Sequence, residues 1–162
     1  MKIVFIPECY ADTTLIDFFL RDKSKRIHQR GNTKVADTMQ KQAAQHYRIV
    51  GIVDADKRQP TYFQKIKEIK TFNNVALFQK DDSEQYLIML KPALEAFLIN
   101  SCKEISVELS DFELPNSLKE LTAITKNVSI ADNHKFKRLL KTLKDSPTFQ
   151  NLDLFFKELE TI

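Results

Sequence analysis

Two pairs of acidic residues stand directly behind apolar stretches of the chain. Glu8 follows the first stretch, with Asp12 four positions later. Asp54 and Asp56 close a second stretch, one residue apart. Alternate side chains of an extended segment point the same way, so Asp54 and Asp56 can face one point in space. Carboxylates that converge repel each other unless a divalent cation neutralises them, and oxygen ligands suit Mg²⁺ or Mn²⁺. The spacing predicts a metal site.

A structural explanation of these acids stays open. Acidic residues that follow a strand often cap the next helix or simply meet solvent. A single D-x-D pair would favour the structural explanation, because such pairs are common after strands. The second acidic strand end favours the metal site, because the two groups would then need one common explanation.

The elements that must position these residues alternate along the chain. Runs of apolar residues indicate buried strands, and apolar residues at a spacing of three to four indicate helices, with Asp12 as a candidate N-cap. Strands are expected at 2–6, 26–29, 48–56, 74–79 and 84–90, and helices at 12–22, 33–47, 61–69 and, opened by Pro92, 93–102. Such alternation predicts an α/β fold with an open, mostly parallel sheet flanked by helices. Right-handed crossovers make the strands before Glu8 and Asp54 neighbours, and ligands collect at the carboxyl ends of such strands.

The last third of the chain is expected to be helical. Helices are predicted at 116–127, 133–145 and 147–159, with Ser117, Asn133 and Ser146 near their starts. The expected division is an α/β domain at 1–105 and a C-terminal helical extension at 106–162 that packs on it. The segment KFKRLLKTLK (135–144) is a basic amphipathic helix. Most helices of this kind are solvated over an apolar stripe, and contact with nucleic-acid phosphates is the alternative.

Composition excludes several classes of protein. The chain has 162 residues, a net charge of +3 and only 2 glycines, which argues against a β-barrel and against a glycine-rich phosphate loop. Cys9 and Cys102 do not have the spacing of a metal-binding pair, and the three histidines are scattered, so zinc is not expected. The apolar run at the amino terminus is too short for a signal peptide or a membrane span. A cytoplasmic protein without a membrane partner is expected.

These residues resemble the TOPRIM domain, which occurs in topoisomerases, bacterial primases and OLD-family nucleases. The segment IPECYADTTLIDFFL (6–20) is similar to the first motif of that family, a Glu that closes a strand with an acidic residue four positions later. The segment GIVDADK (51–57) is similar to the second, the D-x-D. Cys9 stands where the family usually has Gly. With LKPALEAFLI (90–99) after the core, the chain looks most like small stand-alone TOPRIM proteins of the OLD type.

The resemblance implies metal-dependent hydrolysis of phosphodiester bonds in DNA or RNA, with a role in defence or repair. Glu8 would then be the catalytic acid or base, or a ligand of a second metal ion. The metal ligands would be Asp54, Asp56, Asp12 and Glu95. A nearby lysine could stabilise the transition state, and three stand near strand ends: Lys57, Lys80 and Lys91. The alternative is a non-catalytic TOPRIM-like module that binds nucleic acid or another protein and works with an ATPase partner.

Overall fold

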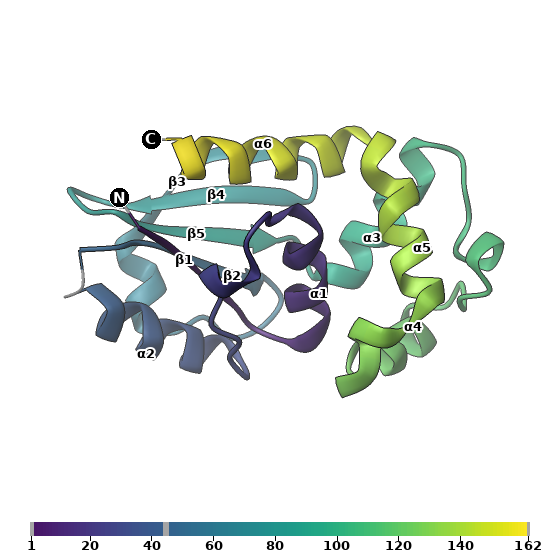
Figure 1. Ribbon diagram of the computed structural model, residues 1–162, viewed down its shortest axis with the longest axis horizontal. Helices are drawn as coiled ribbons and strands as arrows, with labels where there is room; N and C mark the ends of the chain where they lie inside the picture. Colours follow the sequence, from purple (N-terminus) through teal and green to yellow (C-terminus); the bar gives the residue numbers. More distant parts are fainter. Residues whose placement is uncertain (1, 44–45, 162) are drawn as a thin grey trace.

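The computed structural model describes residues 2–43 and 46–161 (Figure 1). Five strands form one open sheet in the order β1-β2-β5-β4-β3. Their bounds are β1 Ile3–Pro7, β2 Arg48–Asp54, β3 Ile66–Phe72, β4 Val75–Lys80 and β5 Gln85–Leu90. β1, β2 and β5 run parallel, whereas β4 and β3 are antiparallel to their neighbours. The fold is therefore α/β with a mixed sheet.

The prediction of a mostly parallel sheet was wrong, because the segment between β2 and β5 forms two antiparallel strands. The predicted helix at 61–69 is instead a short 3₁₀ turn, η3 (Thr61–Lys65), followed by β3. Asn73 adopts a left-handed φ of 46° in the two-residue turn from β3 to β4, a conformation that asparagine tolerates well. A turn this short, like the connection from β4 to β5, can only join antiparallel neighbours, because a parallel crossover needs about a dozen residues.

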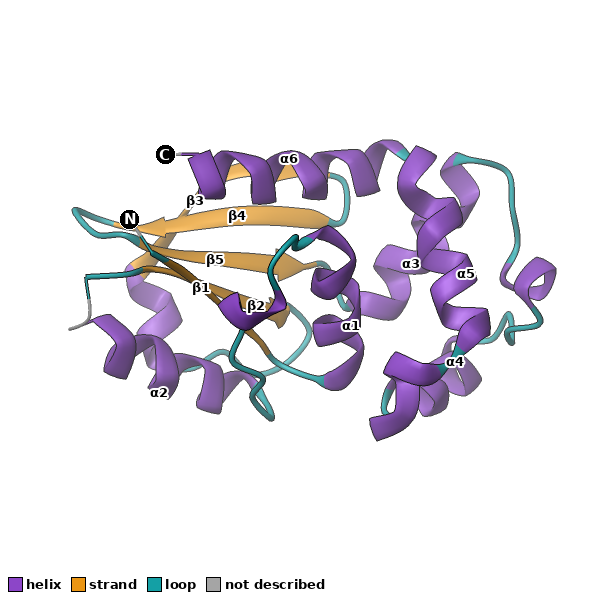
Figure 2. Ribbon diagram, viewed as in Figure 1, coloured by secondary structure: helices purple, strands orange, loops and turns teal. Residues whose placement is uncertain are grey.

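The helices lie on both faces of the sheet and beyond one end of it (Figure 2). The α-helices are α1 Tyr10–Phe19, α2 Asn32–Gln42, α3 Leu94–Glu104, α4 Leu118–Thr125, α5 His134–Thr142 and α6 Pro147–Thr161. The remaining 3₁₀ turns are η1 Lys23–Lys25, η4 Leu109–Phe112, η5 Val128–Asp132 and η6 Leu143–Asp145. None of the helices in the described part of the chain has the length and apolar character needed to cross a bilayer.

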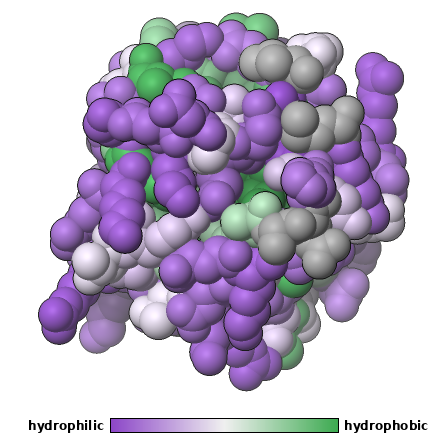
Figure 3. Space-filling view, turned by 90° about the vertical axis from the view of Figure 1, so that its left-hand side faces the viewer, coloured by the Kyte–Doolittle hydropathy of each residue, from purple (hydrophilic) through white to green (hydrophobic). Residues whose placement is uncertain are grey.

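An apolar core lies on each face of the sheet. The larger core joins the strands to α1, α3 and the C-terminal helices, and the smaller one lies under α2 and η3. The Phe156 ring of α6 lies 5.1 Å from the Phe5 ring of β1 and 5.2 Å from the Phe19 ring of α1. The helix that ends the described chain therefore packs on its first strand. The end of the molecule that carries both termini is mostly hydrophilic (Figure 3).

Local capping agrees with most of the predicted helix starts. The side chains of Ser117 and Asn133 accept the backbone N–H groups of Glu120 and Phe136, and so cap α4 and α5. The predicted N-cap of α1 was wrong, because Cys9 takes that position and its Sγ accepts the Asp12 N–H at 3.4 Å. The expected strand at 26–29 is reduced to one bridge between Arg26 and Phe5.

Candidate active site

The carboxyl ends of β1, β2 and β5 meet at one edge of the sheet. Figure 1 shows β2 and β5 ending toward α1 and α3, and both helices begin at this edge, α1 at Tyr10 and α3 at Leu94. Glu8 follows β1 and Asp54 is the last residue of β2, so two of the expected acids occupy adjacent strand ends. Helix N-termini favour negative charge, and this edge is therefore suited to anions or to a cluster of carboxylates.

Glu8 is buried and has partners for both carboxylate oxygens. Its Oε2 accepts the backbone N–H of Asp54 at 3.0 Å, which ties β1 to the end of β2. Its Oε1 forms an ion pair with Lys57, whose side chain is 49% exposed. Burial lowers the pKa of Lys57, but the hydrogen bond and the charge of Glu8 outweigh burial and leave this pKa raised. Lys57 thus supplies the positive charge that the buried glutamate needs.

Asp12 is the least compensated of the acids. The residue is completely buried in α1, and neither of its carboxylate oxygens has a hydrogen-bond partner among the described residues. Burial, followed by the charge of Asp54, raises the pKa of Asp12 well above its usual range. A buried carboxyl without partners costs several kcal/mol if it is ionised, so this position calls for a proton or a cation.

Asp54 lies between Asp12 and α3. Its Oδ1 accepts the backbone N–H of Leu94 at 3.0 Å, at the first turn of α3. Burial, and next the charge of Glu8, raise the pKa of Asp54 to about 7. The charge of Glu95 also raises the pKa of Asp54, whereas the charge of Lys57 lowers it. Asp54 therefore changes its charge near neutral pH, which is unusual for an aspartate.

The remaining predicted ligands lie at the margin of this cluster. Asp56 is exposed, and its backbone N–H donates to the carbonyl of Pro92 at 2.8 Å. The alternation that would align Asp56 with Asp54 ends with β2, because the chain bends at residues 55–57. Glu95 is half-buried in the first turn of α3 and accepts the hydroxyl of Thr125 from α4. The roles of Asp56 and Glu95 as metal ligands stay predictions.

Other residues at this edge carried no distinguishing signal in the sequence. Of the three lysines near strand ends, Lys57 contacts the acids, while Lys91 pairs with Glu68 on β3 and Lys80 lies over the Tyr62 ring. Thr125, the partner of Glu95, is 30 positions away along the chain. Only the folded arrangement of the helices brings such residues together.

A stack of side chains lies beside the cluster on α1. The rings of Tyr10 and His28 are 4.3 Å apart, and the Arg30 guanidinium donates to the Tyr10 hydroxyl at 2.7 Å. His28 Nδ1 lies 2.8 Å from the hydroxyl of Thr13, which donates to the carbonyl of Cys9. With that proton engaged, His28 donates through Nδ1. Burial, then the charges of Arg30 and Arg26, lower the pKa of His28, so the ring is neutral.

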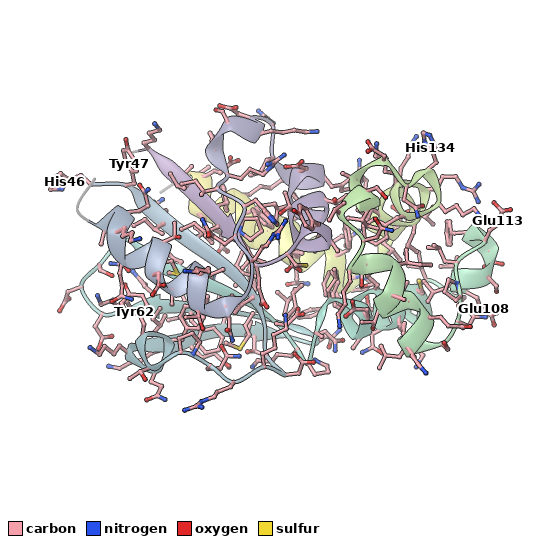
Figure 4. The ribbon with its side chains drawn as sticks, turned by 90° about the horizontal axis from the view of Figure 1, so that it is seen from below. His46, Tyr47, Tyr62, Glu108, Glu113 and His134 are labelled. Carbon is pink, nitrogen blue, oxygen red and sulfur yellow. The ribbon has the colours of Figure 1, made fainter. Side chains whose placement is uncertain are left out.

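The oxygen donors fit Mg²⁺ in type, and two buried carboxylates of the cluster, those of Asp12 and Asp54, have oxygens that no described residue engages. Within the described residues, no three His, Cys, Asp or Glu side chains are arranged so that they could hold a metal ion together. Glu8 is engaged by Lys57 and the Asp54 N–H, which leaves Asp12 and the second oxygen of Asp54. Mg²⁺ is commonly bound through one or two carboxylates, with water and substrate phosphate as its other ligands. Two of the histidines, His46 and His134, lie at opposite ends of the molecule, so these two do not meet at one metal site (Figure 4).

Comparisons of the chain with models of protein families, with curated proteins and with solved structures find no match. The fold and the acidic cluster are therefore the basis for assigning a function. They define an α/β protein in which buried carboxylates that repel each other gather where three parallel strands end.

Proposed function

We propose that this protein is a Mg²⁺-dependent phosphodiester hydrolase that acts on nucleic acid, as the TOPRIM resemblance implies. The observation that carries the proposal is the Asp12 carboxylate, which is completely buried, has no partner among the described residues and lies close enough to Asp54 for the two charges to interact. Folding alone gives no reason to keep two such carboxylates together. A divalent cation between them would remove the cost.

The residues of the cluster have separate roles in this proposal. Asp54 and Asp12 would hold Mg²⁺, and the chemistry that the ion would supply is charge stabilisation at the substrate phosphate and a more acidic water. Glu8 accepts a proton from the attacking water once Lys57 has moved from it. Lys57 is half-exposed and unbranched, so its ammonium group can turn from Glu8 toward a phosphate. Asp56 and Glu95 lie at the margin and act through the waters around the cluster.

A nuclease assay tests the proposal directly. Labelled single- and double-stranded DNA and RNA are incubated with the protein in Mg²⁺, in Mn²⁺ or in EDTA. We expect cleavage that requires the cation and that is lost in both Asp54→Asn and Glu8→Gln, which preserve side-chain size. Asp82→Asn is the matched control, because Asp82 is exposed before β5, at the opposite edge of the sheet. Cleavage that persists in EDTA or in Glu8→Gln would refute the assigned site.

A second function is favoured by one observation. Glu8 has a complete set of protein partners without a metal, and Asp54 accepts a helix N–H, as a structural carboxylate would. In this alternative the protein is a non-catalytic module that binds nucleic acid or a protein partner such as an ATPase. Binding by such a module depends on Lys and Arg, so Glu8→Gln would leave the affinity for nucleic acid unchanged.

A further inference from the structure

Two adjoining hollows lie between α1 and the C-terminal helices. One, of about 380 Å³, is lined by Phe18 and Phe19 of α1 and by Lys144 and Phe149. The other, of about 320 Å³, is bounded by the opposite side of Phe18 together with residues of η5 and α5. We call the two together the Phe18 groove, since that ring lies on the boundary between them.

Lysines surround the Phe18 groove. Lys137 and Lys141 lie one turn apart on the same side of α5, and Lys144 follows in η6. All three are exposed, and none takes part in an ion pair with the described residues. The apolar stripe of the same helix is buried, as the sequence predicts. Lys144 lines the first hollow, whereas Lys137 and Lys141 line the second. Exposed lysines gathered along one groove without acidic partners repel each other, and a polyanion would relieve that repulsion.

The acids that line the groove do not neutralise these lysines. Asp17 accepts two hydrogen bonds from the guanidinium of Arg26 and lies 3.9 Å from Lys23. Asp153 pairs with Lys157 one turn along α6. Both carboxylates are therefore already compensated, and the net charge of the groove stays positive.

The ring of Phe18 is placed for stacking. Phe18 is half-buried, and its neighbours Phe19 and Phe149 meet it at steep angles, with centroids 5.9 Å away in each case. No other described aromatic ring lies parallel to it, and the Lys144 ammonium lies 4.7 Å from its centroid. Lys144 thus lies over one face of a half-buried ring. Single-stranded nucleic acid suits such a site, because a base can stack on the ring in place of the ammonium group while lysines contact the phosphates.

The groove runs along α1, the helix that also carries Asp12 of the acidic cluster. Thr14 lines it, and the Thr14 hydroxyl donates to the carbonyl of Tyr10 one turn earlier in α1. Tyr10, Thr14 and Phe18 share one side of the helix, because they are four residues apart. Asp12 is two residues from both Tyr10 and Thr14, so the acidic cluster and the groove adjoin different sides of the same helix.

We infer that the Phe18 groove binds single-stranded nucleic acid, with one base on Phe18 and the phosphates on Lys137, Lys141 and Lys144. The inference deepens the proposed function and rests on it, because it names the form of the substrate and a surface that binds it beside the helix that carries Asp12. A duplex presents its bases only at the groove edges and cannot offer one to Phe18 without being opened.

Fluorescence anisotropy in EDTA tests binding apart from hydrolysis. The probes are labelled oligo-dT and oligo-U of about 20 nucleotides and a DNA duplex of the same length. The triple variant Lys137→Gln, Lys141→Gln, Lys144→Gln is compared with a control triple variant that loses the same charge on the other face of the sheet. The control positions are exposed lysines of α2 and η3, namely Lys34, Lys41 and Lys65.

We expect the groove variant to bind single strands at least about 10-fold more weakly than the control, with a salt slope reduced by about 2. Phe18→Leu should weaken binding by about 10-fold and leave the salt slope unchanged. Equal affinity of the two triple variants, or a preference for the duplex, would overturn the inference. If the groove variant and the control variant both bind and cleave like the wild type, the groove is refuted and the proposed hydrolase is not. Groove-dependent binding without cation-dependent cleavage would refute the proposed hydrolase instead.

Discussion

Replacing Asp54 with asparagine separates the charge of this residue from its hydrogen bond. Asp54 Oδ1 accepts the Leu94 N–H at 3.0 Å, and the carbonyl oxygen of an asparagine can accept the same bond. The substitution removes only the negative charge of Asp54, a residue that is 7% exposed and close enough to Glu8 for their charges to interact. We therefore expect Asp54→Asn to stabilise the metal-free protein wherever Asp54 would be ionised.

The raised pKa sets the size of this effect and its dependence on pH. Burial, then the charge of Glu8, raise the pKa of Asp54 from 3.8 to about 7. The folded chain therefore holds this proton more tightly than the unfolded chain does. The contribution of Asp54 to the free energy of unfolding is highest below about pH 4 and falls as the pH rises toward 7. The loss is on the order of 4 kcal/mol, and Asp54→Asn avoids it.

Urea unfolding in EDTA measures the difference. At about pH 8 Asp54→Asn should be more stable than the wild type, by up to about 4 kcal/mol, and near pH 4 the two should be about equal. Asp82→Asn is again the control. A variant that is less stable than the wild type at the higher pH by about 0.5–2 kcal/mol would refute the reasoning. That result would mean that Asp54 acts as a structural cap of α3, whose ionised form the fold prefers.

Two further predictions concern the two cores. Gly51→Ala should lower the free energy of unfolding by about 1 kcal/mol in a urea titration, because the new methyl group would lie 2.7 Å from Met39 Sδ and 2.9 Å from Leu87 Cδ1; an unchanged midpoint would mean that these flexible side chains move aside freely. Phe156→Ala should cost about 3–5 kcal/mol, because this buried ring packs on both β1 and α1. A smaller loss in the same measurement would mean that α6 is only loosely attached to the sheet.

The parts of the fold that could be predicted from sequence are those whose pattern has one interpretation. β2 is buried along its whole length, and four of its five residues between Arg48 and Asp54 are Ile or Val. β3 is an edge strand in which only Ile66 is buried, and its apolar residues Ile66, Ile69 and Phe72 stand three apart, as in a helix. The register shifts between Glu68 and Lys70, so the strand does not alternate regularly. Periodicity alone cannot identify such a strand.

The candidate site shows a similar division. The placement of Glu8 beside Asp54 follows from two neighbouring parallel strands, which local sequence patterns can suggest. The burial of Asp12 depends on where α1 begins, and that was set by Cys9 rather than by the better capping residue. The partnership of Lys57 with Glu8 depends on the path of the chain after β2. Side-chain contacts of this kind follow from tertiary packing, and no spacing in the sequence encodes them.

The packing of α6 on β1 has a consequence for folding during synthesis. Arg48, at the start of β2, is buried and donates to the carbonyl of Leu159 at 2.7 Å, and Phe156 covers Phe5. At about 5–20 residues per second, the ribosome needs on the order of 10–30 s to reach α6 after it has made β1. During that time this face of the nascent sheet lacks the part of its cover that α6 provides, and the Arg48 guanidinium lacks its carbonyl partner. The first strand of the chain therefore gains its full packing only after a segment about 140 residues further on has been made.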